Sequence, residues 1–155
     1  MGRQTLEMGM KVLRRGDVLG IYPEGTRSPD GRLYRGKTGP VRMAIEAGVP
    51  IIPCAVKGTR EAMPEGAKLP RRKPVSVTYG EPLDFSRYAG EHEDPFVLRS
   101  ATDELMYELM MMSGQEYVDE YAAGVKKGKV TIDESLSGRA AGPEPESDDG
   151  ARRAS

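Results

Sequence analysis

Residues 17–28 read DVLGIYPEGTRS, and they decide the fold that the sequence predicts. The apolar run from Asp17 to Tyr22 has the composition of a buried strand, and Pro23 ends it. A polar loop from Glu24 to Gly39 follows, in which Ser28 to Gly31 (SPDG) is a turn signal. Because α/β folds bind ligands beyond the carboxyl ends of buried strands, this loop is the first candidate for a functional site.

Helices are predicted on both sides of this loop. Thr5 to Arg15 places apolar side chains on one face, and Gly16 stands where a glycine ends a helix. Pro40 to Ala47 starts with a proline, which suits a first helical turn, and Gly48 ends it. The loop is therefore expected to lie between two helices.

A long amphipathic helix is predicted in the C-terminal half, from Phe96 to Met112. Gly114 ends it, and a shorter helix is expected from Tyr117 to Ala123. The apolar stripe of the long helix consists of Leu98, Ala101, Leu105, Leu109 and Met112.

Two further strands are predicted between the helices. Val49 to Val56 (VPIIPCAV) is interpreted as a buried strand whose prolines favour an edge or an irregular start. Val75 to Tyr79 alternates apolar and polar residues, and a basic, proline-rich loop from Gly58 to Pro74 separates the two. Short strands between helices predict an α/β sandwich, a small mixed sheet flanked by helices.

The chain of 155 residues has the size of one domain. Residues 1–132 are predicted to fold. Residues 133–155 are predicted to be a disordered polar tail, because from Ser137 onward the sequence has no large apolar side chain to bury.

Composition excludes several classes of function. A net charge of −1 does not indicate a nucleic-acid binder, and a single cysteine allows no intrachain disulfide. Cys54 is interpreted as a small buried apolar residue and His92 as a solvated loop residue. No cluster has metal-ligand spacing, so no metal is expected. No apolar run approaches the ~20 residues of a membrane-spanning helix.

The loop after the first strand has the chemistry of a phosphate site. Arg27 can bind a phosphate with two parallel hydrogen bonds, while Gly25 frees backbone N–H groups for the same ligand. The hydroxyls of Thr26 and Ser28 can add donors. Glu24 could orient Arg27 or accept a hydrogen bond from a substrate hydroxyl. A purely structural turn with a Glu–Arg pair explains the same residues, and the residues alone leave both interpretations open.

A second motif in the loop resembles a nucleotide-binding sequence but lies in the wrong structural context. Gly31 to Thr38 matches the P-loop pattern G-x-x-x-x-G-K-[ST] letter for letter. The predicted strand, however, ends well before Gly31, and the loop interior is bulky where a nucleotide needs small residues. A P-loop nucleotide binder is therefore the least favoured hypothesis.

Several of these segments together resemble the glycerophospholipid acyltransferase family, in particular the bacterial 1-acylglycerol-3-phosphate acyltransferases. Residues 22–28, YPEGTRS, are similar to the family's third block, FPEGTRS, and Lys37 to Gly39 follows where the family has Lys-x-Gly. Residues 44–53, AIEAGVPIIP, resemble the fourth block, and residues 80–83, GEPL, the end of the last strand. The likeness covers roughly residues 5–125, so that 1–132 would be the C-terminal portion of an acyltransferase domain.

The resemblance implies a reaction and roles for residues. An acyl group would pass from acyl-CoA or acyl carrier protein to 1-acylglycerol-3-phosphate, giving phosphatidic acid, with no cofactor beyond this co-substrate. The protein would lie peripherally on the cytoplasmic side of the cell membrane, on an anionic surface. The acceptor phosphate would be bound by Glu24, Gly25, Thr26, Arg27, Ser28 and Lys37. The acyl-donor side would be formed by Val49, Pro50 and Pro53.

The chain departs from the family at the catalytic element, a histidine with an aspartate five positions later. His92 is the only histidine, and Val97 stands five positions on. The family's second block, a Gly…Arg segment that helps to bind the glycerol phosphate, is also absent. The catalytic histidine is therefore expected upstream of this chain, which would be truncated. The alternative is an inactive module that binds lipid phosphate or an anionic membrane through the loop and residues 68–73.

Overall fold

The computed structural model describes residues 2–64 and 66–128. The predicted tail, residues 133–155, lies outside the described residues. The helices are α1 (Arg3–Arg14), α2 (Gly39–Ala47), α3 (Thr59–Ala62), α4 (Pro95–Ser113) and α5 (Ala122–Lys126), with a 3₁₀ turn η1 (Ser86–Tyr88). The strands are β1 (Leu33–Tyr34), β2 (Cys54–Lys57), β3 (Ser76–Tyr79) and β4 (Tyr117–Val118).

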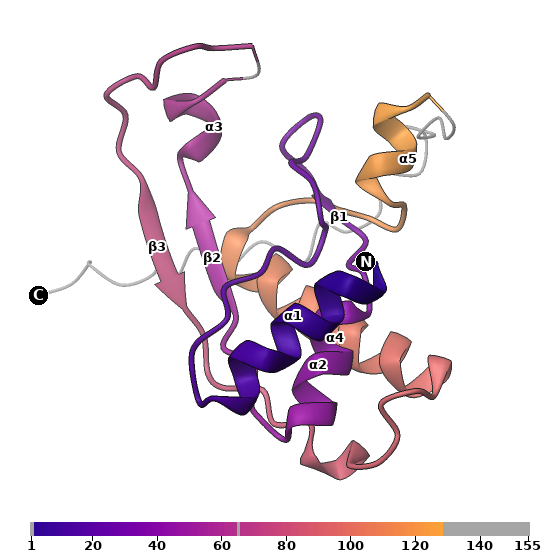
Figure 1. The fold of residues 1–155 in the computed structure, drawn as a ribbon. Coiled ribbons are helices and arrows are strands. Elements are labelled where there is room, and N and C mark those ends of the chain that lie inside the picture. The colour runs from indigo at the N-terminus through magenta and orange to yellow at the C-terminus, as the bar shows by residue number, and fades with distance from the viewer. Residues whose placement is uncertain (1, 65, 129–155) are drawn as a thin grey trace, which may run out of the picture.

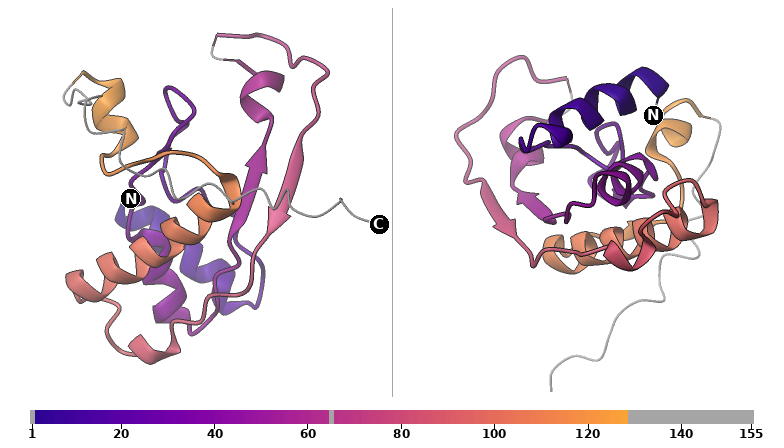
Figure 2. Two further views of the ribbon diagram at one scale, coloured as in Figure 1. Left: turned by 180° about the vertical axis from the view of Figure 1, so that it is seen from behind. Right: turned by 60° about the horizontal axis from the view of Figure 1, so that its bottom comes forward.

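Three helices build the body of the molecule, with α2 between α1 and α4 (Figure 2, right). Helix α1 ends as predicted, with Gly16 at a φ of 80° after the last turn. It approaches α2 closely at Gly9, where a built Cβ would lie only 2.5 Å from Met43 Sδ. A side chain at position 9 would therefore push the two helices apart.

Helix α4 supplies most of the core. The predicted stripe is buried except for Met112, which is half-buried. Asp94 caps the helix by accepting hydrogen bonds from the N–H groups of Phe96 and Val97, and Gly114 ends it with a φ of 68°. The stripe packs against α2 and the turn before η1, in a cluster of Leu33, Val41, Ile45, Phe85, Leu98, Ala101, Leu105, Met106 and Leu109.

The described strands form two separate pairs instead of the predicted single sheet. Strands β1 and β4 are parallel, with Leu33 opposite Tyr117 and Tyr34 opposite Val118. Strands β2 and β3 are antiparallel and rise from the body as a hairpin (Figure 1). A mixed α/β arrangement is confirmed, but its sheets are smaller than expected.

The prediction of a buried strand at residues 17–22 is wrong. The stretch is irregular, Val18 is 95% exposed and Tyr22 is 81% exposed. Within the described ranges 2–64 and 66–128, no strand pairs with its backbone. An apolar run forms a buried strand only where a neighbouring strand accepts its hydrogen bonds and another layer covers its side chains.

The second predicted strand is shorter and more exposed than expected. Its start is irregular, as the prolines predicted, with only an isolated bridge between Ile51 and Leu83 before β2 begins at Cys54. Cys54 itself is exposed, which contradicts its interpretation as a buried apolar residue. Only Ala55 of β2 is buried, because α4 covers a single face of the hairpin.

The predicted helix at residues 117–123 is also wrong. Tyr117 and Val118 form β4, and the helix α5 starts only at Ala122. The long loop after β2 contains one helical turn, α3, that the sequence pattern did not indicate. Helix α2 begins at Gly39, one residue before the predicted start at Pro40.

Candidate functional site

The candidate site is the connection between α1 and α2, called here the site loop (residues 22–37). Its two ends are joined, because Lys37 N–H donates to the Pro23 carbonyl oxygen at 2.9 Å. Gly25 N–H donates to the Tyr22 carbonyl oxygen at 3.0 Å and closes the first turn. Residues that stand far apart in the loop sequence are therefore brought to one place.

Gly25 and Lys37 meet at this place. Gly25 has a φ of 71°, and a Cβ built on it would lie 3.0 Å from Lys37 Nζ. Glycine is favoured here because its backbone lies in the left-handed region, and a Cβ would also have to displace the end of the Lys37 side chain. The ammonium group thus lies directly against the backbone of the PEGTR turn.

Arg27 and Thr26 follow in the same turn. Arg27 is exposed and Thr26 is half-buried. Among residues 2–64 and 66–128, neither side chain makes a hydrogen bond or an ion pair. A cationic side chain without a partner among the described residues leaves its donors available to an anion.

Glu24 is half-buried, and its carboxylate contacts the backbone of β1. Its Oε2 accepts the Tyr34 N–H at 2.9 Å. Burial raises the pKa of Glu24, and the hydrogen bond from Tyr34 offsets part of that effect. No Glu24–Arg27 pair occurs in the described part of the chain, so the purely structural interpretation of the loop as a Glu–Arg pair does not hold.

Ser28 closes the predicted SPDG turn. Its Oγ accepts the Gly31 N–H at 2.8 Å and lies 3.2 Å from Asp30 Oδ1, to which it donates. The turn itself is confirmed. The hydroxyl of Ser28 is occupied within the turn, in contrast to that of Thr26.

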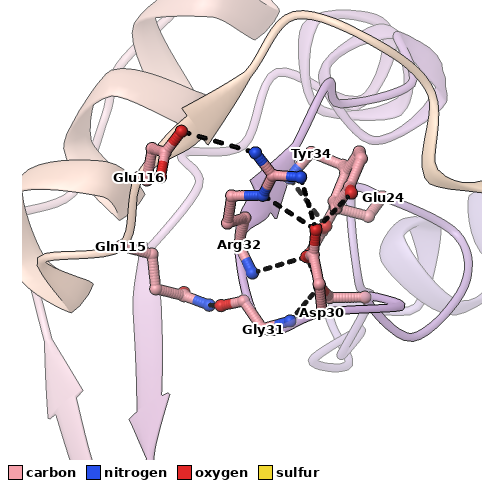
Figure 3. Close-up of polar contacts among 8 residues, drawn as sticks. Glu24, Asp30, Gly31, Arg32, Tyr34, Gln115 and Glu116 are labelled. Atoms are coloured by element: carbon pink, nitrogen blue, oxygen red, sulfur yellow. Dashed lines mark hydrogen bonds and ion pairs between the residues drawn. The ribbon is translucent and has the colours of Figure 1, made fainter. Parts of the chain in front are cut away.

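Asp30 is the centre of a polar network that holds the loop (Figure 3). Its carboxylate accepts from Arg32 Nε at 2.8 Å and from the Tyr34 hydroxyl at 2.9 Å. Partial burial acts to raise the pKa of Asp30, but the hydrogen bonds from Arg32 and Tyr34 outweigh it and lower the pKa to about 2. Asp30 is therefore ionised at any physiological pH.

The network is tied to the segment after α4. Gln115 Nε2 donates to the Gly31 carbonyl oxygen at 2.6 Å, and Leu33 N–H donates to the Glu116 carbonyl oxygen at 2.9 Å. Figure 3 shows Gln115 and Glu116 approaching the turn from the side opposite Glu24. The β1–β4 pair thus joins two segments that lie more than 80 residues apart in the sequence.

Helix α4 holds the other end of the loop at Gly36. Arg99 Nη1 donates to the Gly36 carbonyl oxygen at 2.9 Å. A Cβ built on Gly36 would lie 2.6 Å from Met106 Sδ, so only glycine allows the loop to lie this close to the helix. Lys37, the next residue, is positioned by this contact.

The P-loop hypothesis is not supported by this geometry. A phosphate cradle needs unengaged backbone N–H groups, yet those of residues 31–35 all donate within the protein. Tyr34 is fully buried at the middle of the string. The sequence therefore matches the pattern G-x-x-x-x-G-K-[ST] without forming a phosphate-binding loop.

The predicted donor-side residues lie elsewhere. Val49 is half-buried, Pro50 exposed and Pro53 buried, on the connection from α2 to β2. This connection enters β2 from the end of the molecule opposite the site loop (Figure 1). His92 lies in the turn before α4 and is half-buried rather than fully solvated.

Sequence patterns missed the residues that hold the site in place, chiefly Asp30, Tyr34 and Gln115. A strand of two residues, such as β1, is too short to show a periodic pattern. Gln115 donates to the Gly31 carbonyl oxygen 84 positions away, so its neighbours in the sequence do not indicate this contact. The one usable signal was Asp30 in a Ser-Pro-Asp-Gly turn.

The described residues include no group of three or more His, Cys, Asp or Glu side chains arranged to hold a metal ion. Within the same residues, no helix is both long and apolar enough to cross a membrane.

Comparisons with known proteins agree with the resemblance seen in the sequence. The Acyltransferase family model matches residues 2–57. The 1-acyl-sn-glycerol-3-phosphate acyltransferase of Limnanthes alba is 33% identical over 95 residues, 61% of this chain and 34% of the relative. That of Bacillus subtilis is 32% identical over 89 residues, 57% of this chain and 41% of the relative.

A solved structure shows the same likeness in three dimensions. The 1-acyl-sn-glycerophosphate acyltransferase PlsC of Thermotoga maritima superimposes with a TM-score of 0.52 at 25% identity. The alignment covers 83% of this chain and 45% of that protein, so the chain spans less than half the length of the relatives named here. In sequence and in fold, the chain therefore resembles the glycerophospholipid acyltransferase family.

Proposed function

We propose that this chain contributes the acceptor-binding part of an enzyme that acylates 1-acylglycerol-3-phosphate and forms phosphatidic acid. The observation that carries the proposal is the meeting of Lys37 with the turn that presents Arg27. It is supported by relatives whose names state this activity.

The acceptor phosphate would lie over the Gly25 turn. Arg27 would contribute two parallel hydrogen bonds and Lys37 a point charge, while the Thr26 hydroxyl could add a third donor. Ser28 would act indirectly, since its hydroxyl closes the SPDG turn. Glu24 would support binding by anchoring the turn to β1 rather than by touching the phosphate, because its carboxylate is engaged by Tyr34 N–H.

The chemistry would be ordinary acyl transfer. The acceptor hydroxyl oxygen forms an ester bond with the acyl carbon, the C–S bond of the thioester breaks, and a general base takes the hydroxyl proton. We assign that base to a histidine outside these 155 residues, because Val97 instead of an aspartate stands five positions after His92. No metal or further cofactor is needed for these steps.

The acyl donor would be acyl-CoA or acyl carrier protein, approaching the connection that contains Val49, Pro50 and Pro53. We place the protein on the cytoplasmic side of the cell membrane as a peripheral protein. Its acceptor is a membrane lipid, and α4, the longest described helix, does not have the apolar character of a span.

The test is acyl transfer to 1-acylglycerol-3-phosphate by the full-length gene product carrying Arg27→Ala or Arg27→Lys. Both changes should lower turnover about 100-fold or more, because a point charge doesn't reproduce the two-point contact of a guanidinium. Arg14→Ala is the matched control, since this arginine on α1 makes only a surface pair with Glu46. Full activity of Arg27→Ala would remove the assignment.

A second candidate is a lipid-phosphate binding module without catalysis. The observation in its favour is that Arg27 and Lys37 are accompanied by no histidine in the site loop. It predicts that the 155-residue chain binds a lysophosphatidate headgroup and cleaves no thioester. Thioester cleavage by this chain would exclude it.

A further inference from the structure

A second cationic feature lies outside the site loop, on the long connection between β2 and β3, called here the arm (residues 58–75). The arm projects from the body at the end of the molecule where the site loop also lies (Figures 1 and 2). It carries five cationic and two acidic side chains, a net charge of +3, whereas the whole chain has a net charge of −1. Its charge therefore differs in sign from that of the rest of the protein.

The arm is closed at its base. Gly58 has a φ of 86°, and a Cβ built on it would lie 2.2 Å from the Pro74 carbonyl oxygen. Further along, Arg71 N–H donates to the Ala62 carbonyl oxygen at 2.7 Å and ties the returning chain to α3. These contacts hold the base of the arm and its returning part, and residues 68–73 of that part are all exposed.

The outer part of the arm combines four cationic side chains with one exposed leucine. Leu69 is 78% exposed between Lys68 and the run of Arg71, Arg72 and Lys73. In the part of the chain that the structure describes, none of the four cationic side chains pairs with an acidic group. Exposed cations around an exposed leucine match an anionic lipid surface, where the charges meet headgroups and the apolar side chain enters the interface.

One contact connects the arm to the site loop. A Cβ built on Gly31 would lie 3.1 Å from Arg60 Nη1, so the side chain of Arg60 on α3 lies against the SPDG turn. The orientation of the arm on a surface would thereby set the orientation of the site loop on the same surface.

We propose that the arm docks on an anionic lipid bilayer through Lys68, Leu69, Arg71, Arg72 and Lys73, and so presents the site loop to the membrane. The proposal does not depend on acyl transfer, because it concerns binding to the bilayer alone. A basic surface can also receive an acidic protein, but an exposed leucine within the cation run favours the bilayer.

The test is flotation of the purified chain with vesicles of phosphatidylcholine alone or mixed with phosphatidylglycerol, at low and high salt. The wild-type chain should bind the anionic vesicles and be released by salt, which screens the attraction. The triple variant Arg71→Gln, Arg72→Gln, Lys73→Gln should bind about 100-fold more weakly, since each cation near the surface contributes about fivefold. Leu69→Ser should lower binding about tenfold.

Controls separate this surface from other sources of binding. The triple variant Lys11→Gln, Arg14→Gln, Arg15→Gln removes the same charge from the last turn of α1 and the residue that follows it. This variant should bind vesicles like the wild-type chain. Equal losses in the two triple variants, or undiminished binding of the arm variant, would overturn the proposal. If the arm variant still binds vesicles but loses binding to acyl carrier protein, the partner of the arm is an acidic protein instead of a bilayer.

Discussion

The site loop and the arm are both irregular connections rich in Arg, Gly and Pro, yet they are built in opposite ways. The site loop is held by hydrogen bonds that Glu24 and Asp30 accept and Gln115 donates, and Tyr34 within it is fully buried. The arm is closed by a few backbone contacts at its base, and the cationic residues of its outer part, Lys68, Arg71, Arg72 and Lys73, are exposed. Positioned cations serve to bind one ligand in one geometry, whereas exposed cations serve a surface that has no fixed geometry.

The largest expected effect tests how the site loop is held. Tyr34→Ala should lower the free energy of unfolding by about 3 kcal/mol or more, because it empties a fully buried aromatic position and removes the Asp30 contact. Tyr34→Phe retains the ring and should cost only about 1 kcal/mol. Urea unfolding followed by circular dichroism measures both, and similar values for the two variants would show that the ring isn't part of the core.

An intermediate effect is expected at Asp30 and depends on pH. The pKa of Asp30 is lowered from 3.8 to about 2 in the folded protein, so its ionised form stabilises the fold above pH 3.8, and this stability is lost as pH falls through about 2. Asp30 is partly exposed, so Asp30→Asn should cost only about 1 kcal/mol at neutral pH. Thermal unfolding at a series of pH values should show wild type and variant converging in acid. A difference that stays constant with pH would contradict the role of the Asp30 charge.

The smallest effect is expected in the arm. Replacing Arg71, Arg72 and Lys73 together by Gln should change the free energy of unfolding by less than about 0.5 kcal/mol, since these side chains are exposed and make no pairs among the described residues. The same urea titration measures it. A loss comparable to that of Tyr34→Ala would mean that the arm is part of the folded core, and the contrast between the two regions would fail.

Local patterns predicted the three long helices well, but not the short helices α3 and α5. Helices α1, α2 and α4 end at Gly16, Gly48 and Gly114, all of which adopt positive φ values that other residues avoid. The stripe of α4 is buried because its spacing presents one continuous face to α2. These properties depend on neighbours within a few residues, which a sequence pattern records.

Strand predictions succeeded only where the partner strand was close in sequence. Strands β2 and β3 were anticipated in outline, though not their pairing, whereas β1 and β4 were missed, and residues 17–22 were wrongly assigned to a buried strand. Strand formation depends on hydrogen bonds to another segment, so apolar composition at one segment can't decide it.

The sequence by itself determined the family resemblance, the three main helices and the identity of the phosphate-binding candidates, because each rests on residue type at short spacing. The tertiary structure decided the direction of those side chains. It turned Glu24 inward to Tyr34, left Arg27 without a described partner and placed Lys37 over Gly25. These outcomes depend on contacts with α4 and the segment around β4, which are more than 60 positions away in the sequence. Residues near the loop in the sequence therefore do not indicate these contacts.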